Sequence, residues 1–192
     1  PEARIVHIPN WVDTEMFRPR ERVTRPKRPR LVRVLYVGRL VLEKNLPRLA
    51  RVCQKLGAAL TCLGAGPDEQ ELRDLKAFCP GIIRWEDLPA WHQHADVFCL
   101  PSFTEGHPKA LLEAMASGLA CAVSTGIQAY MMNTMMNTTT FHPTDEAGMA
   151  DAIVRAFENR EHLGLSARGL ALRYEIRDVL PQEIRLLESI AR

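Results

Sequence analysis

Two glutamates eight positions apart, Glu105 and Glu113, are the residues whose types and spacing most clearly suggest chemistry. Glu105 follows an apolar run at 96–101 that is typical of a buried strand. Pro108 then suits the first turn of a helix, and Gly118 suits its end. The sequence therefore places one carboxylate in a loop at the carboxyl end of a strand and the other within the next helix. Ligands of open α/β sheets bind at this edge, where helix N-termini attract phosphate.

Each glutamate also has a simpler explanation. Glu113 lies one helical turn after Lys109, so the two could form an exposed ion pair that contributes little to stability. Glu105 could be a loop carboxylate near a helix dipole, an effect of about 0.3 kcal/mol. The position at a strand end favours a ligand site, and the surface alternative stays open at this stage.

Two further loops that follow predicted strands carry residues suited to phosphate. Glycine permits close approach of the backbone, and Arg and Lys supply positive charge. In a parallel sheet these loops and Glu105 emerge at one edge, which predicts a diphosphate site with a carboxylate on either side. The sequence has neither a G-x-G-x-x-G fingerprint nor a Walker A loop. The residues are Gly38, Arg39 and Lys44 after the first strand, Gly64 and Gly66 after the second, and Gly106 beside Glu105.

The histidines and carboxylates do not suggest a metal site. His92 and His94 are two positions apart on a predicted helix, so they point to different faces, and we expect both to be exposed. His107 lies in the candidate loop, where it could donate a hydrogen bond to a sugar or phosphate, or act only as a spacer. No Ser-His-Asp or Cys-His arrangement can be inferred.

The periodicity of the apolar residues predicts strands that alternate with helices. This order is typical of an α/β, Rossmann-like parallel sheet with helices on both faces, here with a helical C-terminal extension. Between 126 and 143 the pattern is weaker and indicates a short helix and then an edge strand. The predicted strands are 32–37, 58–63, 81–85, 95–100 and 119–124, and the predicted helices are 45–56, 68–78, 88–94, 108–117, 144–159, 161–175 and 176–191.

The composition is that of one globular domain. The chain has 192 residues, and 46% of them are hydrophobic, which is ample for a core. A formal net charge of +2 does not indicate a nucleic-acid partner. The five cysteines are scattered without disulfide or metal-ligand spacing, which favours a reducing compartment. No apolar run approaches the roughly 20 residues that span a bilayer, and no signal peptide is evident.

A basic stretch lies near the start of the chain. Residues 18–33 include eight Lys or Arg, one acidic residue and three prolines. They are typical of a solvated linker, with attraction to anionic lipid as the alternative. Because the sequence begins at Pro1 rather than Met, we expect the chain to be a fragment or an excised domain.

Several short motifs occur in order along residues 6–125. They are Ile8–Asp13 with Phe17–Pro19, Gly38–Leu40 followed by Glu43–Asn45, Gly64–Pro67, Ala95–Ser102 and Glu105–Ala116. Together they resemble the C-terminal, donor-binding domain of the retaining, GT-B-fold glycosyltransferases of the glycosyl transferases group 1 family. The last motif, with its two glutamates, is the most diagnostic, and a looser similarity continues through the helix after Asp145.

The resemblance implies a reaction and three catalytic residues. The family transfers a sugar from a UDP-, GDP- or ADP-sugar with retention at the anomeric carbon, without a metal or other cofactor. By resemblance, Arg39 and Lys44 would hold the diphosphate and stabilise the leaving group. Glu105 would lie against the donor sugar.

The resemblance also implies a set of donor-binding residues. Glu113 would accept hydrogen bonds from the ribose hydroxyls, and backbone near 83–85 would frame the base. Main-chain amides at the start of the helix would help to bind the sugar or phosphate. The implied donor-binding residues are Gly38, Gly64, Gly66, Gly106, His107 and Glu113.

A domain division and partners follow from the same resemblance. Residues 1–30 would be an interdomain segment with a basic linker, and 31–192 would form the nucleotide-sugar-binding domain. The N-terminal acceptor domain of the family is missing from this chain, so we expect nucleotide-sugar binding with little turnover. The expected location is cytoplasmic, with peripheral contact at the inner membrane face, and no nucleic acid is expected as a partner.

Two departures from the family pattern keep other functions open. The segment before Ala95 is shorter than usual, and residues 127–143 contain a tandem Met-Met-Asn-Thr where the family has a glycine-rich edge. The altered segment is consistent with a degenerate, non-catalytic nucleotide-sugar-binding or assembly module. A nucleotide-sugar 2-epimerase would keep the fold and change the reaction, although the pattern around Glu105 and Glu113 is closer to that of the transferases.

Overall fold

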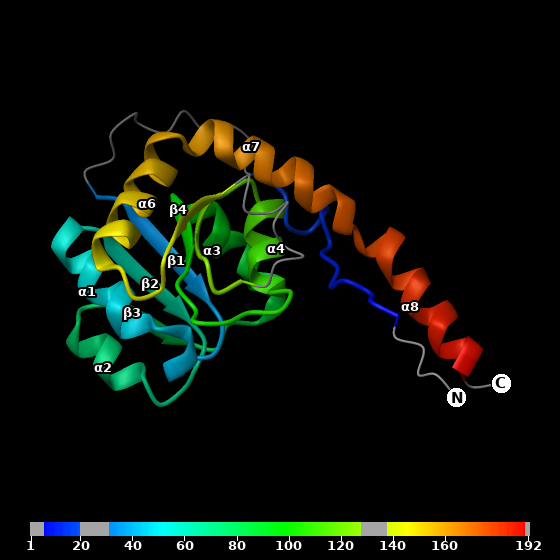
Figure 1. The fold of residues 1–192 in the computed structure, drawn as a ribbon, viewed down its shortest axis with the longest axis horizontal. Coiled ribbons are helices and arrows are strands. Elements are labelled where there is room, and N and C mark those ends of the chain that lie inside the picture. The colour runs from blue at the N-terminus through cyan, green and yellow to red at the C-terminus, as the bar shows by residue number, and fades with distance from the viewer. Residues whose placement is uncertain (1–5, 20–30, 128–137, 191–192) are drawn as a thin grey trace.

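The computed structural model describes residues 6–19, 31–127 and 138–190, and its core is one sheet covered by helices on both faces (Figure 1). Six strands lie in the order β3-β2-β1-β4-β5-β6, and every pairing is parallel. The strands are β1 Arg33–Val37, β2 Ala59–Leu63, β3 Phe78–Gly81, β4 Val97–Leu100, β5 Ala120–Ser124 and β6 Thr139–Phe141. Strands β1 to β3 are added toward one edge of the sheet and β4 to β6 toward the other, so β1 and β4 are neighbours at the switch point. The predicted Rossmann-like class is confirmed.

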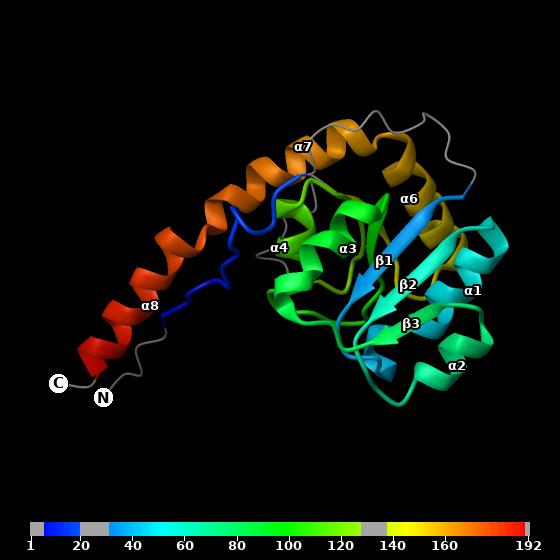
Figure 2. The same ribbon diagram turned by 180° about the vertical axis from the view of Figure 1, so that it is seen from behind.

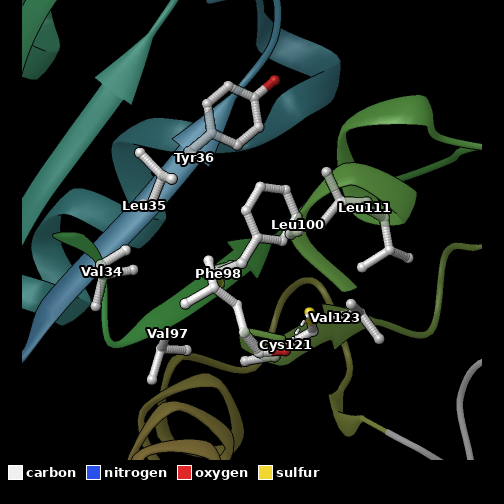
Figure 3. Packing of buried hydrophobic residues seen from close by; sticks show 14 of the residues in the cluster. Val34, Leu35, Tyr36, Val97, Phe98, Leu100, Leu111, Cys121 and Val123 are labelled. Atoms are coloured by element: carbon white, nitrogen blue, oxygen red, sulfur yellow. Dashed lines mark hydrogen bonds between the residues drawn. The ribbon is translucent and has the colours of Figure 1, made fainter. Parts of the chain in front are cut away.

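The central strands are buried on both faces, as parallel strands between helical layers must be. All residues of β4 and β5 are buried, which explains why these segments are continuous apolar runs rather than alternating ones. Figure 3 shows Leu35 of β1, Phe98 of β4 and Leu111 of the following helix in one cluster. The core therefore lies directly beneath the loops that carry the candidate site.

The helices form two layers, one on each face of the sheet (Figures 1 and 2). Helix α6 packs against β5, β6 and α1, whereas α4 packs against β4, β5 and α7. The α-helices are α1 Leu46–Leu56, α2 Glu69–Asp74, α3 Leu88–His94, α4 Lys109–Ala116, α6 Glu146–Glu158, α7 Arg160–Ala171 and α8 Ile176–Ile190. Short 3-10 helices, η1 Leu42–Lys44, η2 Trp85–Asp87 and η4 Leu172–Tyr174, connect some of them.

The helix predicted at 68–78 is wrong at its C-terminal end. Helix α2 stops at Asp74. Lys76 has a φ of 66°, a left-handed conformation that is incompatible with a continuing α-helix. Phe78 therefore begins the next strand, β3, and Ala77 lies in the connection before it, although the spacing of these two apolar residues also fits a helix.

The strand predicted at 81–85 is also wrong, because β3 occupies Phe78–Gly81. Pro80 lies within this strand, which is at the edge of the sheet, where proline is tolerated. Gly81 has a φ of 90°, and Ile82 beyond it is 81% exposed, so the chain leaves the sheet there. The error shifts residues 82–85 from the sheet into the loop that borders the candidate site.

The C-terminal part begins with the predicted edge strand, β6, which pairs with β5 and is confirmed. The short helix expected before it falls at 128–137, and the basic stretch at 20–30; both lie outside the described residues. Helix α8 extends away from the sheet beyond α7, and residues 6–19 run beside the junction of these helices in both views (Figures 1 and 2). Among the described residues, no helix combines the length and apolar character needed to cross a bilayer.

Candidate functional site

An ion pair between the loops after β1 and β4 lies at the switch point of the sheet. The Nζ atom of Lys44 is 2.6 Å from Oε1 of Glu105, and the side chains are only 15% and 14% exposed. Ser102 also donates a hydrogen bond to Oε1 of Glu105, at 2.7 Å. The loops are joined again by the amide of Phe103, which donates to the carbonyl of Glu43 at 2.9 Å. Two predicted catalytic residues are thus brought into direct contact.

The glycine turns after β1 and β2 interlock with each other. A Cβ atom on Gly64 would lie 1.9 Å from the carbonyl oxygen of Gly38, and one on Gly66 would lie 2.1 Å from that of Leu40. Gly64 also has a φ of 137°. Hydrogen bonds from Gly38 to Leu63 and from Leu40 to Ala65, both 2.9 Å, hold the turns together. These glycines are therefore required by the contact between two turns, which fixes the edge of the sheet that carries Arg39.

Arg39 is exposed and follows Gly38 directly. Its carbonyl accepts a hydrogen bond from the buried hydroxyl of Tyr36 at 3.0 Å, so its backbone is anchored while its side chain faces solvent. Within the described part of the chain, no carboxylate lies in ion-pair distance of the Arg39 guanidinium. Its positive charge is therefore available to an anionic ligand.

Glu113 is buried in α4, with 5% of its surface exposed. The indole Nε1 of Trp85 donates to its Oε1 at 3.3 Å. Burial raises the pKa of Glu113, while the indole hydrogen bond and the charge of Lys109 oppose that effect. Lys109 itself lies over the ring of Trp11, 3.5 Å from its centroid. The simpler explanation of Glu113 as half of an exposed pair is therefore wrong.

His107 and Gly106 form the turn that leads into α4. The amide of Asn10 donates to Nδ1 of His107 at 2.7 Å, and the Asn10 side chain donates to the His107 carbonyl. Burial, together with His7, lowers the pKa of His107 to about 4, so its imidazole is neutral at pH 7. Gly106 is exposed, and a Cβ atom added there would meet nothing within 4 Å. Because Nδ1 of the neutral His107 ring accepts from the Asn10 amide, this atom cannot donate a hydrogen bond to a sugar.

The expectation that His92 is exposed is wrong, whereas His94 is exposed as predicted. The His92 ring stacks on Phe98 and meets the ring of Phe17 edge-on, and its Nδ1 pairs with the Leu88 carbonyl at 2.9 Å. Burial lowers its pKa to about 4. The described residues contain no group of three or more His, Cys, Asp or Glu suited to a metal ion.

The structure adds two residues that sequence reasoning did not assign to the site, Ser102 and Asn10, and the side chain of Trp85, of which only the backbone was expected there. The sequence could have indicated Ser102, because it stands three residues before Glu105 at the end of a strand. It gave no indication of the side chain of Trp85, since residues 81–85 were predicted to be a strand. Asn10 lies 97 positions from His107, and only the fold shows that they meet.

These observations define a class: a Rossmann-like α/β domain whose charged loops and glycine turns meet at the switch point of its sheet. The sequence profile of the family described as Glycosyl transferases group 1 matches residues 32–159, so the chain belongs to that family.

Two curated relatives illustrate the relationship. Sulfoquinovosyl transferase SQD2 of Arabidopsis thaliana is 30% identical over 184 residues, covering 86% of this chain and 36% of that protein. The GDP-mannose-dependent alpha-(1-6)-phosphatidylinositol monomannoside mannosyltransferase of Mycobacterium tuberculosis is 33% identical over 147 residues, covering 62% of this chain and 37% of that protein. The chain thus spans little more than a third of the length of these relatives.

Solved structures show the same fold. Sucrose-phosphate synthase from Thermosynechococcus elongatus superposes with a TM-score of 0.79 at 22% identity, covering 95% of this chain and 52% of that one. The C-terminal domain of a group 1 glycosyl transferase (LpcC) from Francisella tularensis gives 0.69 at 19% identity, covering 86% and 99%. At these identities the likeness concerns the fold alone.

Proposed function

We propose that this chain is the donor-binding half of a retaining glycosyltransferase that takes a hexosyl group from a nucleotide-diphosphate sugar without a metal. The match to group 1 glycosyl transferases supports the reaction class. The name of the Mycobacterium tuberculosis relative specifies GDP-mannose, which supports a donor of this chemical kind. The motifs at 38–45 and 105–116 carry the specific assignment of residues.

The observation that carries the proposal is the contact between Lys44 and Glu105 at the switch point. Breaking the bond between a sugar and a diphosphate builds negative charge on the diphosphate, and fixed cations nearby stabilise it. Lys44 is positioned for this role, and Arg39 presents a second cation from the adjoining turn. Two such cations supply the charge that a divalent metal supplies in other transferases. The carboxylate of Glu105 is then left to face the sugar.

Glu113 would bind the nucleoside. A carboxylate has acceptor sites for about four hydrogen bonds, and the described part of the chain supplies Glu113 with one side-chain donor, Trp85. The two vicinal hydroxyls of a ribose would fill part of this capacity. With the ribose at Glu113 and the diphosphate at Lys44, the nucleotide would lie across the carboxyl ends of the central strands.

The acceptor would bind to a part of the enzyme outside this chain. Because the chain corresponds to a little more than a third of its relatives, we propose that transfer requires an N-terminal acceptor domain and that the isolated chain turns over little donor. The relative named above acts on a phosphatidylinositol monomannoside. We propose by analogy a cytoplasmic protein with peripheral contact at the inner membrane face.

Calorimetric titration of the chain with UDP, GDP and ADP, each with and without EDTA, tests the proposal. We expect one nucleotide to bind, with affinity unchanged by EDTA. At 100 times its dissociation constant it should stabilise the fold by about 2.7 kcal/mol. Absence of binding by all three nucleotides, or binding that EDTA abolishes, would contradict it. Retention is tested by the anomeric configuration of the product, measured by NMR with the full-length enzyme.

A further inference from the structure

Three segments that are far apart in the sequence meet at the turn of residues 105–109. They are the turn itself, the segment at 10–14 near the start of the chain, and the junction between η4 and α8 at 174–176. Both views show residues 6–19 beside this junction and close to α4 (Figures 1 and 2). The contacts between them are specific rather than merely close.

Asn10 holds His107 from two directions. Its amide donates to Nδ1 of the imidazole at 2.7 Å, and its side-chain amide donates to the carbonyl of the same residue. The lowered pKa of His107, about 4, keeps the imidazole neutral and Nδ1 an acceptor at pH 7. One residue further on, the ring of Trp11 lies under the ammonium of Lys109, 3.5 Å from the centroid. Two consecutive residues of one segment, Asn10 and Trp11, therefore hold the turn at His107 and at Lys109.

The same segment is fixed to the start of α8. The amide of Val12 donates to the carbonyl of Tyr174 at 2.8 Å, and the amide of Ile176 donates to the carbonyl of Val12 at 3.0 Å, as in a short parallel bridge. Thr14 donates from its amide to Oε2 of Glu175 at 3.1 Å. Val12 is only 1% exposed, so this junction is part of the folded core.

Glu105 is held by Lys44, by Ser102 and by the carbonyl of Gly126, but the next residue of the turn has little support. Gly106 is exposed and open on its Cβ side, and within the described ranges no acceptor pairs with its amide. The ring of His107 contacts Tyr174, with centroids 5.1 Å apart, so the turn rests on the η4–α8 junction. The conformation that presents the amides at 106 and 107 thus depends on contacts from outside the motif.

We propose that Asn10 is a positioning residue that holds the turn of 105–109 in the conformation that binds the diphosphate–sugar end of the donor. This inference rests on the proposed function and deepens it. The nucleoside end would be bound by Glu113 and Trp85, which Asn10 does not touch. Loss of Asn10 should therefore lower the affinity of ligands that extend beyond the first phosphate more than the affinity of ligands that end there. A purely structural role would weaken all ligands equally.

The test compares Asn10→Ala and Asn10→Asp with the unsubstituted chain by calorimetry, using UMP and UDP, or GMP and GDP if guanine is preferred. Aspartate keeps the shape of asparagine but cannot donate to the His107 carbonyl. We expect both variants to bind the diphosphate about five-fold more weakly and the monophosphate within about two-fold, since a hydrogen bond contributes about 1 kcal/mol. Asn159→Ala is the matched control. Asn159 is exposed, and its side-chain amide also donates to a main-chain carbonyl, that of Arg155, at 2.9 Å and far from the site.

The possible results distinguish the positioning role of Asn10 from the proposed function. Equal weakening of mono- and diphosphate, or no weakening of either, overturns the positioning role of Asn10 and leaves the proposed function intact. Failure of the unsubstituted chain to bind any nucleotide overturns both. Thermal unfolding of each variant, measured against Asn159→Ala, shows whether a loss of affinity arises from a loss of fold.

Discussion

The loop after β4 holds Glu105 beside an ammonium group, whereas helix α4 buries Glu113 against an indole N–H. Glu105 has Lys44 at 2.6 Å and the Ser102 hydroxyl at 2.7 Å on the same oxygen. Glu113 accepts a hydrogen bond from Trp85 at 3.3 Å, and Lys109, whose charge acts on its pKa, lies over the ring of Trp11. The two carboxylates share one motif, but among the described residues only Glu105 has a cation in ion-pair contact.

This difference indicates how the two ends of a donor would be held. Glu105 is paired with Lys44 without a ligand, so under the proposed function a diphosphate would share or take over Lys44 and leave Glu105 to face the sugar. Glu113 is buried and has one side-chain donor, Trp85, among the described residues, so its carboxylate could accept further hydrogen bonds from a ligand. A ribose supplies such donors without adding charge. On the proposed function, binding would therefore exchange the ion-pair partner of Lys44 at the diphosphate end and add hydrogen bonds to Glu113 at the ribose end.

Replacement of Lys44 by alanine should have the largest effect. The variant loses the cation expected to pair with the diphosphate and leaves Glu105 to repel it. We expect affinity for UDP or GDP, whichever binds more tightly, to fall about 100-fold, within the range for truncating one partner of a buried charge pair. Isothermal titration calorimetry measures this loss.

Lys55→Ala is the matched control for that experiment. Lys55 also forms an ion pair at 2.7 Å, with Glu146, but its side chain is 71% exposed and it lies on α1. We expect its removal to leave nucleotide affinity unchanged and stability within about 0.5 kcal/mol. Equal losses of affinity in the two lysine variants would show that Lys44 acts through general charge and not through position.

Isosteric replacement of the two carboxylates should change stability in opposite directions. Glu105→Gln leaves the half-buried ammonium of Lys44 without its counterion, and we expect a loss of about 2 kcal/mol. Glu113→Gln removes a charge whose burial is unfavourable, and we expect a gain of about 1 kcal/mol together with weaker nucleotide binding. Urea denaturation at pH 7.5 measures both. A loss of stability in Glu113→Gln would mean that a cation compensates Glu113 after all.

The pH dependence of the Glu113 effect has a defined sign. The pKa of Glu113 is raised in the folded chain, so between its unfolded value and its folded value the folded state binds more protons. Stability from this group is therefore fully present below the unfolded pKa near 4.5 and is lost as pH rises through the folded pKa. The gain in Glu113→Gln should be absent at pH 4 and develop toward pH 7.5. A gain independent of pH would indicate a packing effect.

Much of this site could be predicted from the sequence because its residues follow local rules. The loops carrying Lys44 and Glu105 each follow a buried strand, and parallel strands bring their carboxyl ends to one edge. The burial of Glu113 could not be predicted in this way. Lys109 stands one turn before it, and only the position of Trp11, far away in the sequence, shows that this lysine has another contact.

The errors around β3 have a physical origin as well. Residues 77–78 fit both a helix and a strand pattern. The left-handed conformation that ends the helix is adopted by Lys76, and because this residue is not a glycine the sequence gives no sign of it. Pro80 lies within β3, which is an edge strand, where proline is tolerated. The side chain of Trp85 escaped notice for the same reason, because residues 81–85 were predicted to lie in the sheet.

Trp85→Phe should have a smaller effect than the charge substitutions, because it removes one neutral donor and keeps most of the ring. Glu113 then loses its indole hydrogen bond, so its pKa should rise further and its carboxylate should be less well oriented for a ribose. We expect nucleoside diphosphate affinity to fall about five-fold, the size of one hydrogen bond of about 1 kcal/mol. Calorimetry with the diphosphate and with inorganic pyrophosphate, which lacks the ribose, locates the effect. Equal losses for both ligands would contradict a role at the nucleoside end.

Ser102→Ala should have the smallest effect, although its hydrogen bond to Glu105, at 2.7 Å, is shorter than that of Trp85 to Glu113. The reason is that Glu105 keeps Lys44 when the hydroxyl is lost, whereas Glu113 has no ion pair within the ranges that the structure describes. We expect a stability loss of about 1 kcal/mol and a change in diphosphate affinity below about two-fold. If Ser102→Ala weakened nucleotide binding more than Trp85→Phe, the length of the lost hydrogen bond, and not the presence of a cation, would determine how much each glutamate is affected. The contrast between a compensated and an uncompensated glutamate would then not describe this site.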